Sequence, residues 1–286
     1  MPDNFGTPTL RDGLNEAAGL KNDASQFLKL RSLIIEHAPR GNGEPVMVIP
    51  GFCANGVTLL PMRYVFEKLG YKTYNWKPPS QLLIGYNLGP LSYSDKKLKK
   101  HARRIADRHE IGLKIAGQSF GGTVGLDVAD DLAKSGLFGR VVTFGSPVHN
   151  DVLEEDTQHI TPVMRTLFNK LNPPSHRRVK AFRGRMESIM EGGMRGTPVH
   201  SIYSQNDGVV GAIAAMNQWT GARKENYEIG SSHVGMGLHP AALLFALDRF
   251  ALPAGETTPF DLSVYPAELQ DAFLEDDETL YGMAPA

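Results

Sequence analysis

The sequence predicts an α/β fold with a mostly parallel central sheet, helices on both faces of that sheet and a helical, lid-like insertion. Two observations support this class. Short apolar runs that suit strands alternate along the chain with segments whose apolar residues recur at helical spacing. A helix between successive strands is the connection that parallel strands require, so the alternation predicts a parallel sheet.

The strand-like segments are short and bounded by turn-forming residues. They comprise residues 46–49, 71–76, 113–116, 140–144, 199–203 and 227–229. The helix-like segments show apolar residues three and four positions apart. They comprise residues 27–34, 59–69, 94–108, 124–132, 213–219 and 241–250.

The order of these segments predicts three regions. Residues 1–43 form an N-terminal arm and helix, with a loose, polar and Gly-rich arm up to about Asn22. Residues 44–255 form the α/β core, and the alternation inside it is interrupted over residues 148–196, which predicts an insertion. Residues 256–286 form an acidic, solvated extension that contains no Lys or Arg.

Composition excludes several classes of protein. The chain has 286 residues, is 41% hydrophobic and carries a net charge of −1, so neither nucleic acid nor an anionic membrane is an expected partner. Its basic helix at 96–108 is expected to be a solvated face. The single cysteine, Cys53, excludes an intramolecular disulfide and is expected to pack as a small residue.

The chain shows neither a signal peptide nor an apolar stretch of about 18 residues. We therefore expect a soluble, cytoplasmic protein without stable membrane insertion, although a secreted form would also fit a chain without disulfides. The His and Asp residues show no metal-ligand spacing, and no cofactor motif is present. We expect neither a metal nor a cofactor.

Ser119 lies in a Gly-x-Ser-x-Gly turn between a strand-like segment and a helix-like one. The turn is too tight for side chains beside the serine, which explains Gly117 and Gly121. In such a turn the serine projects at the carboxyl edge of the sheet. Its hydroxyl lies above a helix N-terminus, which favours developing negative charge. Ser119 is therefore the predicted nucleophile.

An acid and a histidine follow Ser119 in the order that this arrangement requires. Asp207 comes just after residues 199–203, so it points into the same crevice as Ser119. His233 lies in a loop of small residues that lets its imidazole reach the serine. We expect Ser119 to attack an acyl carbon, His233 to move the proton, and Asp207 to fix the tautomer of His233.

Three other residues compete for the roles of acid and base. Asp151 is the alternative acid. His239 and His200 are the alternative bases, but His239 precedes a proline and is expected to begin a helix, while His200 lies inside a strand-like segment.

Two backbone N–H groups must bind the oxyanion of the reaction. The residue after the nucleophile supplies one, which assigns it to Phe120. The loop after residues 46–49 supplies the other, and Phe52 is the predicted donor with Cys53 as the alternative.

At these positions the chain resembles the lipase and esterase branch of the α/β-hydrolase superfamily, and in particular a bacterial lipase-like group. The likeness covers about residues 44–253 and rests on segments 48–52, 87–90, 116–122, 143–147, 203–210 and 231–235. It implies an α/β-hydrolase fold, a Ser-Asp-His triad and esterase activity. Pro50-Gly51 stands where many lipases have His-Gly.

The expected activity is hydrolysis of carboxylic esters through an acyl-enzyme on Ser119, with a small ester carrying an apolar part as substrate. The same triad in an acyltransferase or thioesterase, and a catalytically silent binding protein on the same fold, are the alternatives. The insertion carries Met and Leu at helical spacing. It is either a lid over the acyl site or a helical excursion whose apolar face is core.

Overall fold

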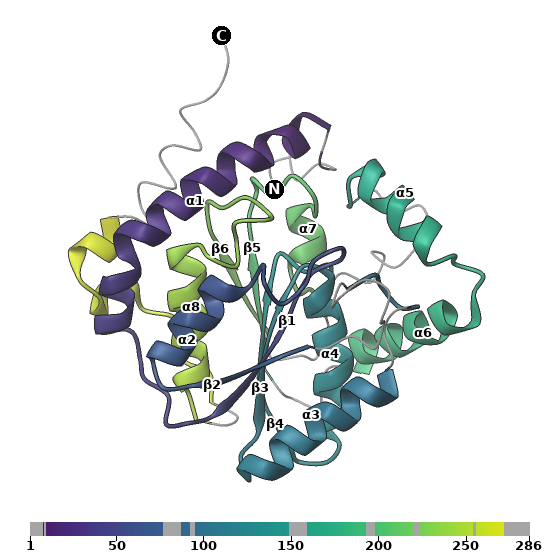
Figure 1. The fold of residues 1–286 in the computed structure, drawn as a ribbon, viewed down its shortest axis with the longest axis horizontal. Coiled ribbons are helices and arrows are strands. Elements are labelled where there is room, and N and C mark those ends of the chain that lie inside the picture. The colour runs from purple at the N-terminus through teal and green to yellow at the C-terminus, as the bar shows by residue number, and fades with distance from the viewer. Residues whose placement is uncertain are drawn as a thin grey trace.

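Six parallel strands form one sheet at the centre of the molecule, in the order β2-β1-β3-β4-β5-β6 (Figure 1). The computed structural model describes residues 8, 10–76, 87–91, 95–148, 159–192, 198–219, 224–253 and 256–271. The strands are β1 (Pro45–Ile49), β2 (Lys72–Asn75), β3 (Leu113–Gln118), β4 (Phe138–Phe144), β5 (Val199–Tyr203) and β6 (Lys224–Glu228). Every strand-like segment predicted from the sequence is therefore a strand of this sheet.

Helices lie on both faces of the sheet. They are α1 (Leu10–His37), α2 (Leu60–Lys68), α3 (Asp95–His109), α4 (Phe120–Ala133), α5 (Pro162–Leu171), α6 (Arg177–Gly192), α7 (Ala212–Ala215), α8 (Pro240–Ala251) and the 3-10 turn η1 (Leu262–Val264). Figure 1 shows α1, α2 and α8 on one side of the sheet, and α3, α4 and α6 on the other. Helix α7 is shorter than the predicted 213–219, because the backbone becomes extended at Met216.

The central strands are buried on both faces because their side chains alternate between two cores. In β1, Val46 and Val48 point to the core shared with α1, α2 and α8, whereas Met47 and Ile49 point to the core shared with α3, α4 and α6. This arrangement explains why these strands are continuous apolar runs in the sequence rather than alternating ones.

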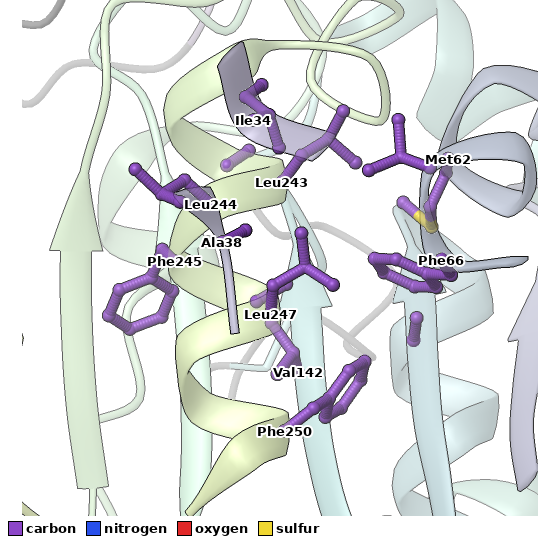
Figure 2. Packing of buried hydrophobic residues seen from close by; sticks show 14 of the residues in the cluster. Ile34, Ala38, Met62, Phe66, Val142, Leu243, Leu244, Phe245, Leu247 and Phe250 are labelled. Atoms are coloured by element: carbon purple, nitrogen blue, oxygen red, sulfur yellow. The ribbon is translucent and has the colours of Figure 1, made fainter. Parts of the chain in front are cut away.

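Helix α8 forms much of the first core. Figure 2 shows its apolar side chains packed between Val142 of the sheet, Met62 and Phe66 of α2, Ile34 of α1 and Ala38 just after α1. All of α8 from residue 240 to 247 is buried. A helix that is apolar on nearly every side must be covered by other elements, and α1 and α2 provide that cover.

The prediction of a loose arm up to about Asn22 is wrong from Leu10 onward, because helix α1 begins at Leu10. Its polar N-terminal half is held in place by two buried acids, Glu16 and Asp23, which bond to loops of the sheet. Those partners are about 200 residues away in the chain. A polar, Gly-rich composition carries no local sign of such contacts.

The start of the predicted solvated extension also packs against the body of the protein. Tyr265 and Leu269 are buried in the first core, and Arg140 donates to the carbonyl oxygen of Glu256. The apolar residues of 260–269 explain this packing. The acidic run 275–278 and the alternative acid Asp151 lie outside the described residues.

Candidate active site

Ser119 sits at the tip of a strained turn between β3 and α4. Its backbone has φ of 53° and ψ of −135°, a conformation that residues with a side chain rarely adopt. Its N–H donates to the carbonyl oxygen of Phe144 on the neighbouring strand at 2.8 Å. This hydrogen bond helps to hold Ser119 in its unusual conformation.

Two glycines make this turn sterically feasible. A Cβ on Gly121 would lie 2.3 Å from the carbonyl oxygen of Ile49, and one on Gly117 would lie 2.4 Å from the Cα of Gly122. Both contacts are with backbone, which cannot swing aside. The glycines in the predicted pattern are therefore required by the close approach of β1, β3 and α4.

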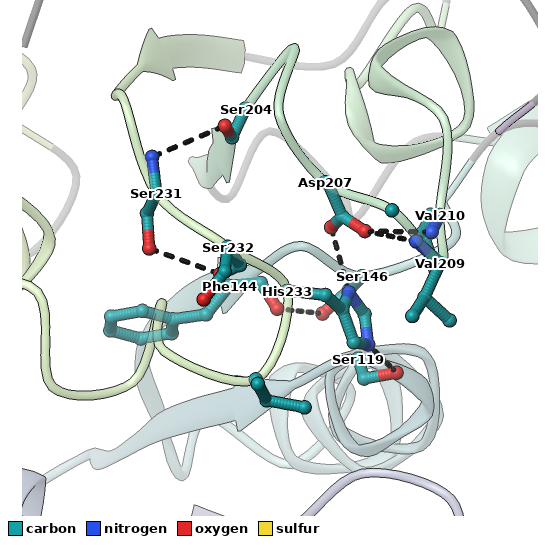
Figure 3. Close-up of polar contacts among 12 residues, drawn as sticks. Ser119, Phe144, Ser146, Ser204, Asp207, Val209, Val210, Ser231, Ser232 and His233 are labelled. Carbon is teal, nitrogen blue, oxygen red and sulfur yellow. Dashed lines mark hydrogen bonds and ion pairs between the residues drawn. The ribbon is translucent and has the colours of Figure 1, made fainter. Parts of the chain in front are cut away.

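Asp207 follows β5 and is held by its own loop. Its Oδ1 accepts hydrogen bonds from the N–H groups of Val209 at 2.9 Å and Val210 at 2.8 Å. Its side chain is buried. The loop therefore occupies one carboxylate oxygen and leaves Oδ2 to face the histidine (Figure 3).

His233 joins Asp207 to Ser119 in one hydrogen-bonded chain, shown in Figure 3. Its Nδ1 lies 2.7 Å from Oδ2 of Asp207, and its Nε2 lies 2.9 Å from Oγ of Ser119. The structure thus brings together the three side chains selected from the sequence. The geometry fits a neutral imidazole that donates from Nδ1 and accepts at Nε2.

The electrostatic surroundings of His233 favour its protonated form. Burial would lower the pKa of His233, but the charge of Asp207, the hydrogen bond to it and the charge of Glu16 raise that pKa above its ordinary value. The imidazole is thereby tuned as a stronger base than a histidine in water.

The competing histidines have other surroundings. His200 in β5 bonds to Arg140 at 2.9 Å and to Glu225 at 2.9 Å, at the opposite end of the sheet from Ser119. His239 is the residue just before α8, as expected from the sequence. Neither is part of the Ser119–His233–Asp207 chain.

The loop after β1 places Phe52 as the second candidate oxyanion donor. Gly51 lies against Ser119, since a Cβ there would be 2.9 Å from the serine Cβ. The N–H of Cys53 already donates to the carbonyl oxygen of Asn87 at 2.7 Å, whereas the N–H of Phe52 has no backbone partner among the described residues. The geometry therefore favours Phe52 over Cys53.

The other candidate donor, Phe120, occupies the first position of α4. The first N–H groups of a helix have no partner within the helix, so this one can bind an external oxygen.

The side chain of Cys53 is exposed, and its backbone has φ of 58°. The prediction that Cys53 packs as a small residue is therefore wrong.

Phenylalanine rings form a row beside the candidate oxyanion donors. Phe168 of α5 lies edge-on to Phe52 and to Phe120, with ring centroids 5.1 Å apart in both pairs. Phe182 of α6 continues the row at 5.7 Å from Phe120. The insertion therefore packs aromatic side chains against Phe52 and Phe120, the two residues that carry the candidate oxyanion donors.

Sequence reasoning missed three polar residues that hold the loops of this site. Gln118 donates from Nε2 to the carbonyl oxygen of His233 at 3.0 Å, and Glu16 accepts from the N–H of His233 at 3.0 Å. Asn87 donates to the carbonyl oxygen of Pro50 at 2.8 Å and so fixes the loop of Phe52. Gln118 and Asn87 stood inside segments 116–122 and 87–90 of the resemblance without a role assigned to them, whereas nothing local marked Glu16.

In the described part of the chain, no three His, Cys, Asp or Glu side chains gather closely enough to hold a metal ion. No helix among the described residues has the length and apolar character needed to cross a membrane.

Comparison with known proteins relates this chain to others through its fold. No family model and no curated protein matches its sequence. Among solved structures, carboxyl esterase 2 of the fungus Tuber melanosporum is 10% identical, with a TM-score of 0.54 over 72% of this chain and 77% of the esterase. The monoacylglycerol lipase of Paleococcus ferrophilus is 14% identical, with a TM-score of 0.49 over 73% of this chain and 97% of the lipase.

The parallel sheet, the order of its strands and this likeness define the class of the protein. The chain has an α/β-hydrolase fold, and the fold class predicted from the sequence is confirmed. At such low identity the likeness carries the fold alone, so the function has to be argued from the site.

Proposed function

We propose that this protein is a serine hydrolase that cleaves carboxylic esters through an acyl-enzyme on Ser119. The observation that carries the proposal is the chain from Asp207 Oδ2 through His233 to Ser119 Oγ, with steps of 2.7 and 2.9 Å. A serine alcohol becomes a nucleophile only when a base removes its proton. Here that base is in hydrogen-bond contact and is oriented by a buried carboxylate.

The reaction follows from these contacts. Oγ of Ser119 attacks the acyl carbon while its proton passes to Nε2 of His233, and the ester carbonyl oxygen becomes an oxyanion. The N–H groups of Phe52 and Phe120 donate to that oxyanion. As the C–O bond to the alcohol breaks, His233 returns the proton to the leaving oxygen. Water then attacks the acyl-enzyme by the same route, releasing the acid and restoring Ser119.

An apolar acyl or alcohol part fits the surroundings of Ser119. The row of Phe52, Phe168 and Phe120 lies directly beside the candidate oxyanion donors. Burying an apolar chain against such rings contributes about 25 cal/mol for each Å² removed from water. We therefore expect kcat/KM to rise with chain length along a series of p-nitrophenyl esters.

A fluorophosphonate probe tests the proposal directly. Wild-type protein should be labelled on Ser119, as read by mass spectrometry, and Ser119→Ala should lose labelling and reduce kcat by on the order of 10⁶. Ser135→Ala is the matched control, because Ser135 is exposed at the end of α4 and should label like wild type. Absence of labelling and of ester hydrolysis in folded wild type would leave the binding-protein alternative.

Product analysis separates hydrolysis from its nearest alternative. With an alcohol present as competing acceptor, a hydrolase releases mainly free acid, whereas an acyltransferase releases mainly the new ester. Replacing the ester by the matching thioester tests the thioesterase alternative in the same assay.

A further inference from the structure

The N-terminal half of α1 carries two buried carboxylates. Glu16 and Asp23 lie on the same face of the helix as Phe27 and Ile34, and all four side chains are buried. Burying a carboxylate is costly unless donors satisfy it. Both acids are satisfied by the loops around Asp207 and His233, rather than by contacts within α1.

Glu16 binds two different loops at once. Its Oε1 accepts from the N–H of Gly208 at 2.8 Å, in the loop of Asp207, and from the N–H of His233 at 3.0 Å. Its Oε2 accepts from the N–H of Val234 at 3.0 Å. One side chain therefore connects the backbone beside the candidate acid to the backbone of the candidate base.

Asp23 binds the beginning of the His233 loop. Its Oδ2 accepts from the hydroxyls of Ser232 at 2.7 Å and Ser231 at 3.1 Å, and from the N–H of Ser232 at 3.2 Å. The helix also comes very close to this loop, since a Cβ on Gly19 would lie 2.5 Å from the Cβ of Ser232. Helix α1 is thus in direct van der Waals contact with the His233 loop.

We propose that Glu16 is a positioning residue for the reaction. Its carboxylate holds the loops of Asp207 and His233 in the relative positions that the Ser119–His233–Asp207 hydrogen bonds require. This inference rests on the proposed ester hydrolysis. The backbone of His233 is held from two sides, by Glu16 at its N–H and by Gln118 at its carbonyl oxygen. Such support matters because displacing a reacting group by about 1 Å can cost 10²-fold in rate.

The charge of Glu16 has a second effect, on the basicity of His233. The acidic groups that face this histidine are Asp207 from the loop after β5 and Glu16 from α1, with Asp23 behind Ser232. Burial lowers the pKa of His233, whereas the charges of Asp207 and Glu16 raise it. Removing the charge of Glu16 should therefore lower this pKa.

Two substitutions separate the geometric effect from the charge effect. Glu16→Gln keeps an acceptor oxygen without the charge, and Glu16→Ala removes both. Because Glu16 contacts loop backbone through its carboxylate, KM should stay within about twofold in both variants. In Glu16→Ala we expect kcat to fall by on the order of 10²-fold. In Glu16→Gln the acidic limb of the pH profile of kcat/KM should move to lower pH.

The matched controls are Glu36→Gln and Glu36→Ala, because Glu36 is exposed on the same helix. Both should keep the wild-type kcat and pH profile. Circular dichroism and thermal melting show whether each variant is folded. If Glu16→Ala fails to fold, the kcat and pH profile of Glu16→Gln alone test the proposed role of Glu16. A folded Glu16→Gln variant with the wild-type kcat and acidic limb would overturn the proposal.

An NMR titration of His233 keeps this test independent of catalysis. A lower pKa of His233 in Glu16→Gln than in wild type would support the role of Glu16, and an equal value would overturn it. If wild type neither hydrolyses esters nor reacts with the fluorophosphonate probe, the proposed function fails. The titration still decides whether Glu16 controls His233.

Discussion

At the scale of single residues, the two oxygens of Asp207 have different partners. Oδ1 accepts two backbone N–H groups of its own loop, and Oδ2 faces Nδ1 of His233. Hydrogen bonds to a charged group contribute about 1.5–3 kcal/mol each, more than bonds between neutral groups. The carboxylate therefore shapes its loop and orients the imidazole at the same time.

Replacing Asp207 by asparagine should separate these two roles. Asparagine keeps one oxygen for the N–H groups of Val209 and Val210, but it presents an NH₂ group to Nδ1 of His233. The histidine would then adopt the tautomer that cannot accept the proton of Ser119. We expect kcat to fall by on the order of 10⁴ while the melting temperature changes little. Steady-state kinetics and calorimetry check this, and a kcat near wild type would return the role of acid to Asp151.

Residues defined by local pattern were predictable, and residues defined by distant contacts were not. Ser119 has a flanking motif, and Asp207 and His233 follow strands in a fixed order. Glu16, by contrast, acts on backbone 217 residues away at His233. A glutamate in a polar helix has the same local pattern whether it faces solvent or the end of a sheet.

At the scale of elements, the two helices of the insertion differ in their packing. Helix α6 buries five side chains: Val179, and four that belong to the core beside α4, namely Phe182, Met186, Ile189 and Met190. Helix α5 buries none completely, and Val163, Leu167 and Leu171 are exposed along one of its faces. The alternative in which the apolar face of the insertion is core thus fits α6. The alternative of a lid over the acyl site stays a prediction for α5 alone.

Phe168 is the residue of α5 through which this prediction can be tested. Phe168→Ala removes the ring between Phe52 and Phe120, so apolar substrates lose part of their wall. We expect kcat/KM for long-chain esters to fall by roughly tenfold, within the 1–3 kcal/mol that such apolar contacts contribute, while acetate esters change little. Leu167→Ala, on the neighbouring exposed position, is the control and should leave both rates unchanged. Equal losses for short and long esters would contradict an apolar subsite.

Helix α1 shows why element boundaries were harder to predict than element types. The apolar positions from Phe27 to Ile34 revealed its second half through their helical spacing. The first half has buried acids where a core-facing helix normally has apolar residues. The spacing of apolar residues therefore indicates a helix only after about Asp23, although the helix begins at Leu10.

At the scale of the whole molecule, buried polar side chains hold neighbouring segments in place at both ends of the sheet. Opposite the Ser119 end, Glu225 accepts from Arg249 at 2.9 Å and bonds to His200 at 2.9 Å. Arg140 completes this cluster through His200 and also donates to the carbonyl oxygens of Pro253 and Glu256. Both guanidinium groups belong to fully buried residues, so this cluster secures the C-terminal segment to the sheet.

Glu225→Ala should therefore destabilise the fold without altering the chemistry at Ser119. Removing the acid takes away the hydrogen bonds of Glu225 to the buried guanidinium of Arg249, which keeps its ion pair with Asp248, so we expect a cost of about 1.5–3 kcal/mol. Urea unfolding should report that loss, while kcat/KM measured well below the unfolding transition should match wild type. Glu228→Ala, at an exposed position at the end of the same strand, removes surface hydrogen bonds from Tyr203 and Gln205 and should cost no more than about 1 kcal/mol. Similar losses in both variants would contradict a special role for the buried cluster.

The contacts of α1 also determine when during synthesis the site can form. Glu16 is made before its partner His233, which follows it 217 residues later in the chain. At 5–20 residues per second, this delay is about 10 to 40 s. Throughout that interval α1 has no loop to hold, and Ser119, once it is made, precedes the histidine that would take its proton by 114 residues. A nascent chain therefore carries the proposed nucleophile without its proposed base, and the proposed hydrolysis becomes possible only after β6 and the loop of His233 have emerged.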